Sequence, residues 1–169
     1  LGTSGMARAR LLLTSGDIDS AIEIMEKQPE SATIFAAPLA GLKCRLLLLK
    51  AGPNNERVRS AYSKYVEARK QRDRETGRPG LPAIAPGVEA IAVLGTDDEV
   101  REALSVLNHY PDPIGFNSYS EPYGYLRGIL ACRLGALDEA QGYFVNQPQT
   151  CEVLKSWFTA SSWKIGPAG

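Results

Sequence analysis

The sequence predicts an all-α protein, an α–α superhelix of about four helical hairpins followed by a C-terminal capping helix. The first observation behind this prediction is a pattern that recurs four times along the chain. An aliphatic residue is followed by alanine after three residues and by a large apolar residue four residues later. These offsets place all three positions on one face of a helix. The instances are Ile18, Ala21 and Met25; Val58, Ala61 and Tyr65; Val100, Ala103 and Leu107; and Leu137, Ala140 and Phe144.

The other two observations concern the spacing of the pattern and the ends of the helices. Successive alanines of the pattern lie about forty residues apart, which is the repeat length of stacked helical hairpins. In three instances a proline follows the alanine after eight residues, at Pro29, Pro111 and Pro148. Proline ends a helix because it has no amide hydrogen to donate. We therefore expect hairpins that stack in chain order, each burying its apolar face against the next.

Turn and capping residues divide the chain into the helices of these hairpins. Gly16, Gly52 and Gly135 permit the turns inside three of them. Thr96 and Glu99 have the spacing of a capping box, which marks the start of a helix. A buried strand is an open alternative for the short segment 88–94. The expected helix pairs are residues 6–14 with 18–27, 35–50 with a helix reaching residue 74, 88–94 with a helix ending near residue 109, and 122–134 with 137–146.

Two proline-rich segments, 77–87 and 111–122, are expected to be loops between the repeats. The first carries three prolines and three glycines, a composition that does not continue a helix. A last helix over 150–163 has no partner of its own and is expected to cover the end of the stack. We interpret residues 1–169 as a single helical-repeat domain, expected to be a fragment of a larger protein, although a tag remnant would also explain the first residues.

Composition and charge argue against several classes of function. Nineteen basic and nineteen acidic residues cancel, so no overall field favours nucleic acid or an anionic membrane. No apolar stretch approaches the roughly twenty residues that cross a bilayer. Cys44, Cys132 and Cys151 form no CxxC pair and His109 is the single histidine, so we expect no metal, no cofactor and no catalytic centre. An odd number of widely spaced cysteines is typical of a reducing compartment, and we expect a cytoplasmic protein.

The first and fourth units share a longer pattern: a small residue in the first helix, a turn glycine, alanine, a large apolar residue and a closing proline. These residues are Ala9, Gly16, Ala21, Met25 and Pro29, and Gly128, Gly135, Ala140, Phe144 and Pro148. The pattern resembles the tetratricopeptide repeat family, with a spacing of about forty residues where that family has thirty-four. The resemblance implies a binding scaffold whose first helices line a groove for a peptide or an element of another protein.

Seven residues of the first helices would line this groove by their position. They are Arg10, Leu13, Leu42, Lys50, Tyr125, Ile129 and Arg133. The three basic residues among them could bind the carboxylates of an acidic ligand through charge-assisted hydrogen bonds. Ordinary solvated surface charges are the alternative interpretation of these three residues.

A cluster of aromatic residues near the second proline-rich segment is a further candidate contact surface. Its members are Tyr110, Phe116, Tyr119 and Tyr123. Tyrosine is favoured in interfaces because its rigid ring buries a large area while its hydroxyl stays hydrogen-bonded. A loop folded over its own core is the alternative interpretation.

These observations together predict a non-catalytic scaffold that binds a protein or a peptide. One alternative is a structural subunit whose apolar faces are permanently buried in a larger complex. The other is a helical repeat that binds nucleic acid through the basic segment 69–78. Acidic residues interrupt that segment and no aromatic residue lies within it to stack on bases, so protein is the favoured partner.

Ala140 tests the packing that the repeated pattern predicts. Replacing this alanine by a large residue is expected to lower the free energy of unfolding by roughly 1–3 kcal/mol through overpacking. Chemical denaturation of the variant and the parent chain measures the difference. A variant as stable as the parent chain would mean that this face of the helix is not buried.

Overall fold

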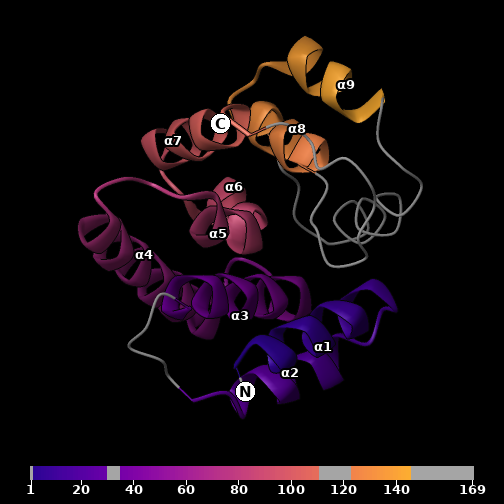
Figure 1. Ribbon diagram of the computed structural model, residues 1–169. Coiled ribbons are helices and arrows are strands. Elements are labelled where there is room, and N and C mark those ends of the chain that lie inside the picture. Colours follow the sequence, from indigo (N-terminus) through magenta and orange to yellow (C-terminus); the bar gives the residue numbers. More distant parts are fainter. Residues whose placement is uncertain (1, 30–34, 111–122, 146–169) are drawn as a thin grey trace.

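A computed structural model describes residues 2–29, 35–110 and 123–145, and within these ranges the chain forms helices and no strand (Figure 1). The predicted all-α class is therefore confirmed for the described residues. The expected loop at 111–122 and the expected helix at 150–163 lie outside them. The helices are α1 Gly2–Thr14, α2 Ile18–Glu26, α3 Ala36–Ala51, α4 Glu56–Thr76, α5 Leu81–Ile84, the 3₁₀ turn η1 Ala85–Gly87, α6 Val88–Leu94, α7 Asp97–Asn108, α8 Tyr123–Arg133 and α9 Leu137–Val145.

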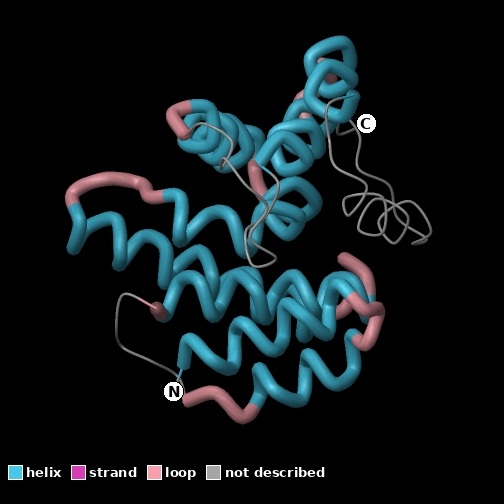
Figure 2. The backbone as a smooth tube through the Cα atoms, turned by 45° about the vertical axis from the view of Figure 1, so that its right-hand side comes forward, coloured by secondary structure: helices cyan, strands magenta, loops and turns pink. Residues whose placement is uncertain are grey.

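Each described helix packs against the next one along the chain (Figures 1 and 2). Contacts also join helices that are not consecutive in the chain: α1 touches α3, α3 touches α6, and α6 touches α8. The apolar helix α3 lies in the middle of the molecule, with α1 and α2 on one side and α5, η1 and α6 on the other (Figure 1). Buried side chains of α1 to α8 form one continuous core, and Phe144 of α9 packs against it.

The turn and capping residues act as the sequence predicts. Gly16, Gly52 and Gly135 have φ angles of 87°, 75° and 77°, in the left-handed region that glycine adopts without steric cost. Thr96 accepts a hydrogen bond from the Glu99 amide at 3.3 Å, and the Glu99 carboxylate accepts one from the Thr96 amide at 2.8 Å. This capping box starts α7 as predicted. Segment 88–94 is the helix α6, so the strand alternative is excluded there.

The prediction of a loop across 77–87 is wrong beyond residue 80. Residues Leu81–Ile84 form α5, Ala85–Gly87 form η1, and most of this segment is buried. Pro82 and Pro86 each lie in the first turn of a short helix, where no intrahelical partner for an amide hydrogen is needed. Prolines that would break the middle of a helix are tolerated here because the chain starts a new helical turn at each of them.

The aromatic ring of Tyr65 on α4 packs between α3 and η1. The side chain is fully buried, and its hydroxyl oxygen lies 2.8 Å from the Ala83 carbonyl oxygen and 3.2 Å from that of Ile84. A Cβ atom added at Gly41 would lie 2.9 Å from the ring, and one added at Gly87 would lie 2.5 Å from it. The two glycines therefore leave the space that the ring fills between α3 and η1.

A buried ion pair links α3 with α6 beside this ring. Arg45 Nη2 lies 2.5 Å from Glu89 Oε1, and the two side chains are only 0% and 2% exposed. Removing charges from water costs free energy that only a close partner offsets. The guanidinium and the carboxylate therefore constrain how α3 and α6 lie against each other.

Single substitutions of this pair are expected to destabilise the chain much more than the double substitution does. Arg45→Met and Glu89→Leu alone each leave one buried charge without its partner, and each is expected to cost about 3–5 kcal/mol. The double variant removes both charges and is expected to recover most of that loss. Urea unfolding of the four proteins gives the coupling energy. Losses that simply add in the double variant would contradict the role assigned to the pair.

Candidate partner-binding groove

The four apolar residues predicted to line a groove are core residues. Leu13, Leu42, Tyr125 and Ile129 are 2%, 0%, 1% and 5% exposed. Their assignment to an open groove is therefore wrong in the described structure. The physical reason is that first helices are covered on more than one side. Helix α3, for example, contacts α1, α2, α4, α5, η1 and α6.

Two of the three basic residues predicted to meet a ligand instead bind carboxylates of neighbouring helices. Lys50 Nζ lies 2.8 Å from Asp19 Oδ1, which joins the end of α3 to α2. Arg133 Nη1 lies 3.0 Å from Asp97 Oδ1, which joins the end of α8 to the start of α7. Arg10 is half-buried on α1. Lys50 and Arg133 thus lie in separate helix pairs and do not form one basic site.

The aromatic cluster falls mostly at or beyond the limits of the described residues. Phe116 and Tyr119 lie outside them. Tyr110 is 36% exposed directly after α7, and its carbonyl oxygen accepts a hydrogen bond from Arg127. Tyr123 is half-buried at the start of α8 and packs against the core. A contact surface built from these residues stays a prediction.

One residue of the basic segment 69–78, Arg69, forms contacts between helices. Arg69 is 4% exposed, and its Nη2 lies 2.6 Å from Glu102 Oε2 on α7. Its guanidinium carbon also lies 5.7 Å from the centre of the Tyr65 ring. The charge of Arg69 is therefore used between α4 and α7, and the segment presents a smaller basic surface than its sequence indicates.

The described residues hold no cluster of histidine, cysteine or carboxylate side chains that could bind a metal ion. No helix among them is long and apolar enough to cross a membrane. His109 ends α7, where its Nδ1 lies 2.6 Å from the Ser105 carbonyl oxygen. Cys44 is buried in the core, and Cys132 is half-buried.

A groove of about 1120 Å³ lies where α2 ends beside the hairpin of α3 and α4. None of the seven residues predicted from the sequence to line a groove lies in it. The α3 and α4 residues that line it recur every three to four residues, so each helix contributes one stripe of its surface. The lining residues are Met25, Glu26, Gln28 and Pro29 near the end of α2; Ala36, Leu39, Ala40, Lys43 and Leu47 on α3; and Glu56, Arg57, Ser60, Ala61, Lys64, Glu67, Ala68, Lys70, Gln71 and Arg74 on α4.

Small apolar residues and charges of both signs share the surface of the groove. Four alanines line it, two on α3 and two on α4. Five basic residues line it against three acidic ones. One of the acidic residues, Glu26, accepts a hydrogen bond from Arg57 at 3.0 Å across one end of the groove. An elongated ligand with a narrow apolar face and acidic edges would match this lining.

Ala61 belongs to the repeated pattern of the sequence, but unlike the other alanines of that pattern it lines the groove. The repeated pattern treats it like Ala21, Ala103 and Ala140, which are 0%, 0% and 1% exposed. Ala61 is instead half-buried and lines the groove. The pattern identifies one face of a helix but does not say whether a neighbour covers that face. Only the packing of α4 against its neighbours decides it.

Comparison with protein-family models, with curated proteins and with solved structures finds no match to this chain. No relative therefore assigns a role to the groove or to any single residue.

The thiol of Cys44 is expected to be inert towards alkylation in the folded chain. Burial raises the pKa of this thiol to about 12, so at pH 8 only about one molecule in ten thousand carries the reactive thiolate. Peptide mass mapping after iodoacetamide treatment, in buffer and in guanidinium chloride, compares the folded and unfolded chains. Equal rates of Cys44 modification under both conditions would contradict its burial.

Proposed function

We propose that this chain is a non-catalytic protein-interaction module. In this proposal its hairpins form an α-solenoid similar to tetratricopeptide repeats, and a segment of a partner protein docks in the groove of α2, α3 and α4. The observation that carries the proposal is the groove itself. It is long, it is lined by two helix stripes, and it combines apolar floor residues with charged edges. Grooves of this kind accept helices of other proteins.

The order of the helix contacts supports the solenoid part of the proposal. Helices α1 and α2, α3 and α4, and α8 and α9 pack as sequential pairs with a glycine in each turn. The first helices of neighbouring pairs also touch, through α1 with α3, α3 with α6, and α6 with α8. The pair of α6 and α7 is shorter, and α5 and η1 precede it. Such a stack would continue in one direction and would expose the side of α4 that lines the groove.

A second candidate is a structural subunit that is permanently assembled with other proteins. Three large apolar side chains favour it, because Leu137, Leu11 and Phe35 are 60%, 44% and 43% exposed. They lie on α9, on α1 and directly before α3. The two candidates differ in the behaviour of the isolated chain. A permanent subunit is expected to aggregate alone and to become soluble with its partner, whereas an interaction module is expected to stay monomeric.

Capture of partners from a lysate of the source cells tests whether the groove is the binding site. Ala61→Trp and Ser60→Trp place a large ring in the groove. Ala51→Trp is the matched control, because Ala51 is exposed at the end of α3 and does not line the groove. We expect the parent chain and the control to retain the same proteins, and the two groove variants to retain at least about tenfold less of them.

Quantitative mass spectrometry measures the retained proteins, and circular dichroism verifies that each variant is helical. Ser60 is exposed, so its substitution tests the groove even if Ala61→Trp destabilises the chain. Equal retention by the parent chain and Ser60→Trp would contradict the proposed binding site.

A further inference from the structure

We propose that the occupant of the groove is an acidic amphipathic helix of another protein. It would lie along the hairpin of α3 and α4, with a face of small and apolar residues on the groove floor and carboxylates towards the basic residues at the edges. This inference rests on the proposed function and adds the chemistry of the partner.

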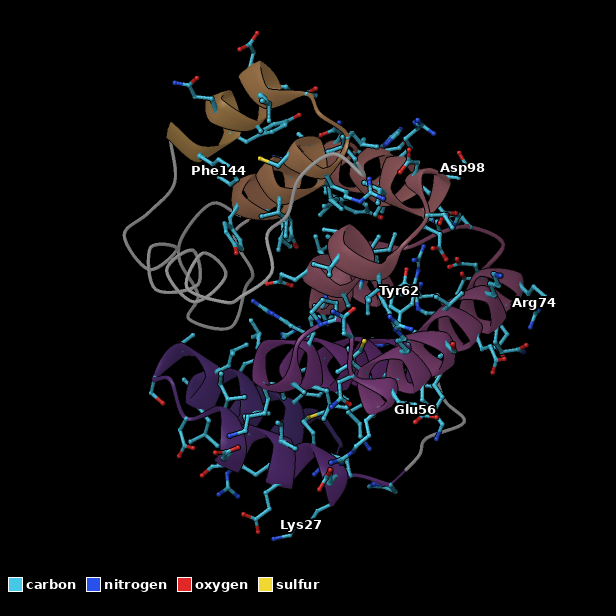
Figure 3. The ribbon with its side chains drawn as sticks, turned by 180° about the vertical axis from the view of Figure 1, so that it is seen from behind. Lys27, Glu56, Tyr62, Arg74, Asp98 and Phe144 are labelled. Carbon is cyan, nitrogen blue, oxygen red and sulfur yellow. The ribbon has the colours of Figure 1, made fainter. Side chains whose placement is uncertain are left out.

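The shape of the groove argues for a helix. Ala36 and Ala40 on α3, and Ala61 and Ala68 on α4, are the small residues of the two stripes. Small side chains let the backbone of a third helix approach two packed helices closely, whereas large ones would hold it away. Glu56 and Arg74 lie near the two ends of the α4 stripe (Figure 3). At a rise of 1.5 Å per residue the stripe is about 27 Å long, which matches a helix of about 18 residues.

The charges of the groove argue for an acidic partner. Lys43 lies eight residues before the end of α3 at Ala51, and Lys64 lies eight residues after the start of α4 at Glu56. Because a short turn joins the two helices, both lysines lie at about the same level, one in each stripe. Lys70 and Arg74 extend the positive charge along α4. Glu26 and Arg57, one acidic and one basic lining residue, bind each other, and the rest of the lining has four basic and two acidic residues.

Helix α4 as a whole carries the same sign of charge. It has seven basic and four acidic residues, and two of the basic ones, Arg57 and Arg69, pair with Glu26 and Glu102 of neighbouring helices. Basic residues beside an apolar floor favour a ligand with carboxylates, because complementary charges steer association and suppress partners of the wrong sign. The excess is moderate, so we expect apolar contact to supply the affinity and charge to supply much of the selectivity.

Two other occupants that this chain could supply fit less well. Residues 146–169 contain one acidic and two basic side chains, which is the wrong sign for the groove. Helix α2 is acidic, with Asp19, Glu23 and Glu26, but its apolar face is buried inside its own chain at Ala21 and Met25. Helix α2 of a second copy therefore has no free apolar face to offer.

The test uses three labelled peptides of about 18 residues, each with leucine and alanine at helical spacing on one face. Their other positions carry mainly glutamate, mainly glutamine or mainly lysine. Fluorescence anisotropy with the full chain gives the dissociation constants. We expect the acidic peptide to bind about tenfold more tightly than the neutral one and to lose affinity as salt is added. The lysine peptide is expected to bind most weakly.

Two double variants localise the effect. Lys43→Glu with Lys70→Glu reverses two charges of the groove, and Arg59→Glu with Arg78→Glu makes the same change in charge at exposed positions outside it. We expect the groove variant to bind the acidic peptide about tenfold more weakly and the lysine peptide more tightly than the parent chain does. The control variant is expected to change either affinity less than about threefold.

The outcomes separate this inference from the proposed function. Equal binding of all three peptides, blocked by Ser60→Trp, would overturn the acidic character while leaving a docking groove. No binding of any peptide would overturn the inference, and groove-dependent capture of proteins would still support the interaction module. Binding of the acidic peptide that neither Ser60→Trp nor the groove charge reversal weakens would place the site elsewhere and overturn it.

Discussion

The seam between α3 and the helices α5, η1 and α6 is the constraint on which the rest of the described structure depends. The buried pair of Arg45 and Glu89 lies in this seam, and the ring of Tyr65 fills the space between Gly41 and Gly87 beside it. The ion pair has a strict geometric requirement because a buried charge needs its partner at hydrogen-bond distance. The two glycines add a steric requirement, because a side chain at either position would collide with the ring. Together they fix α3 and α4 relative to the helices that follow.

The groove is a consequence of that seam. Helix α4 uses Val58, Tyr65 and Arg69 to pack against the rest of the molecule, so a different stripe of the helix is left over. Helix α3 is apolar on nearly all sides, and its buried residues extend to the groove floor at Leu39 and Leu47. The hairpin thus presents a surface of two packed helices that no other described helix covers. A preformed surface favours binding because little conformational entropy is lost when a partner docks.

The basic residues also fall into two groups: some pair with carboxylates between helices, and others line the groove. Lys50, Arg69 and Arg133 bind carboxylates of neighbouring helices and so hold pairs of helices together. Their charge is largely cancelled where they lie. Basic residues in the groove, such as Lys43 and Lys70, face a lining with fewer carboxylates. A chain whose overall charge is zero can therefore present a local positive surface.

The sequence by itself determined most of the helices, where most of them turn, and which faces are apolar. These features depend on residues that are close together in the chain, so local sequence specifies them. Examples are the apolar pattern around Ala21 and Ala103, the turn at Gly16 and the capping box at Thr96. Only the tertiary structure decided which apolar faces are covered. Leu42 and Tyr125 are in the core while Ala61 lines a groove, because burial depends on helices that are distant in the chain. The helical turns at Pro82 and Pro86 have the same origin, since packing against α3 selects a conformation that composition alone did not predict.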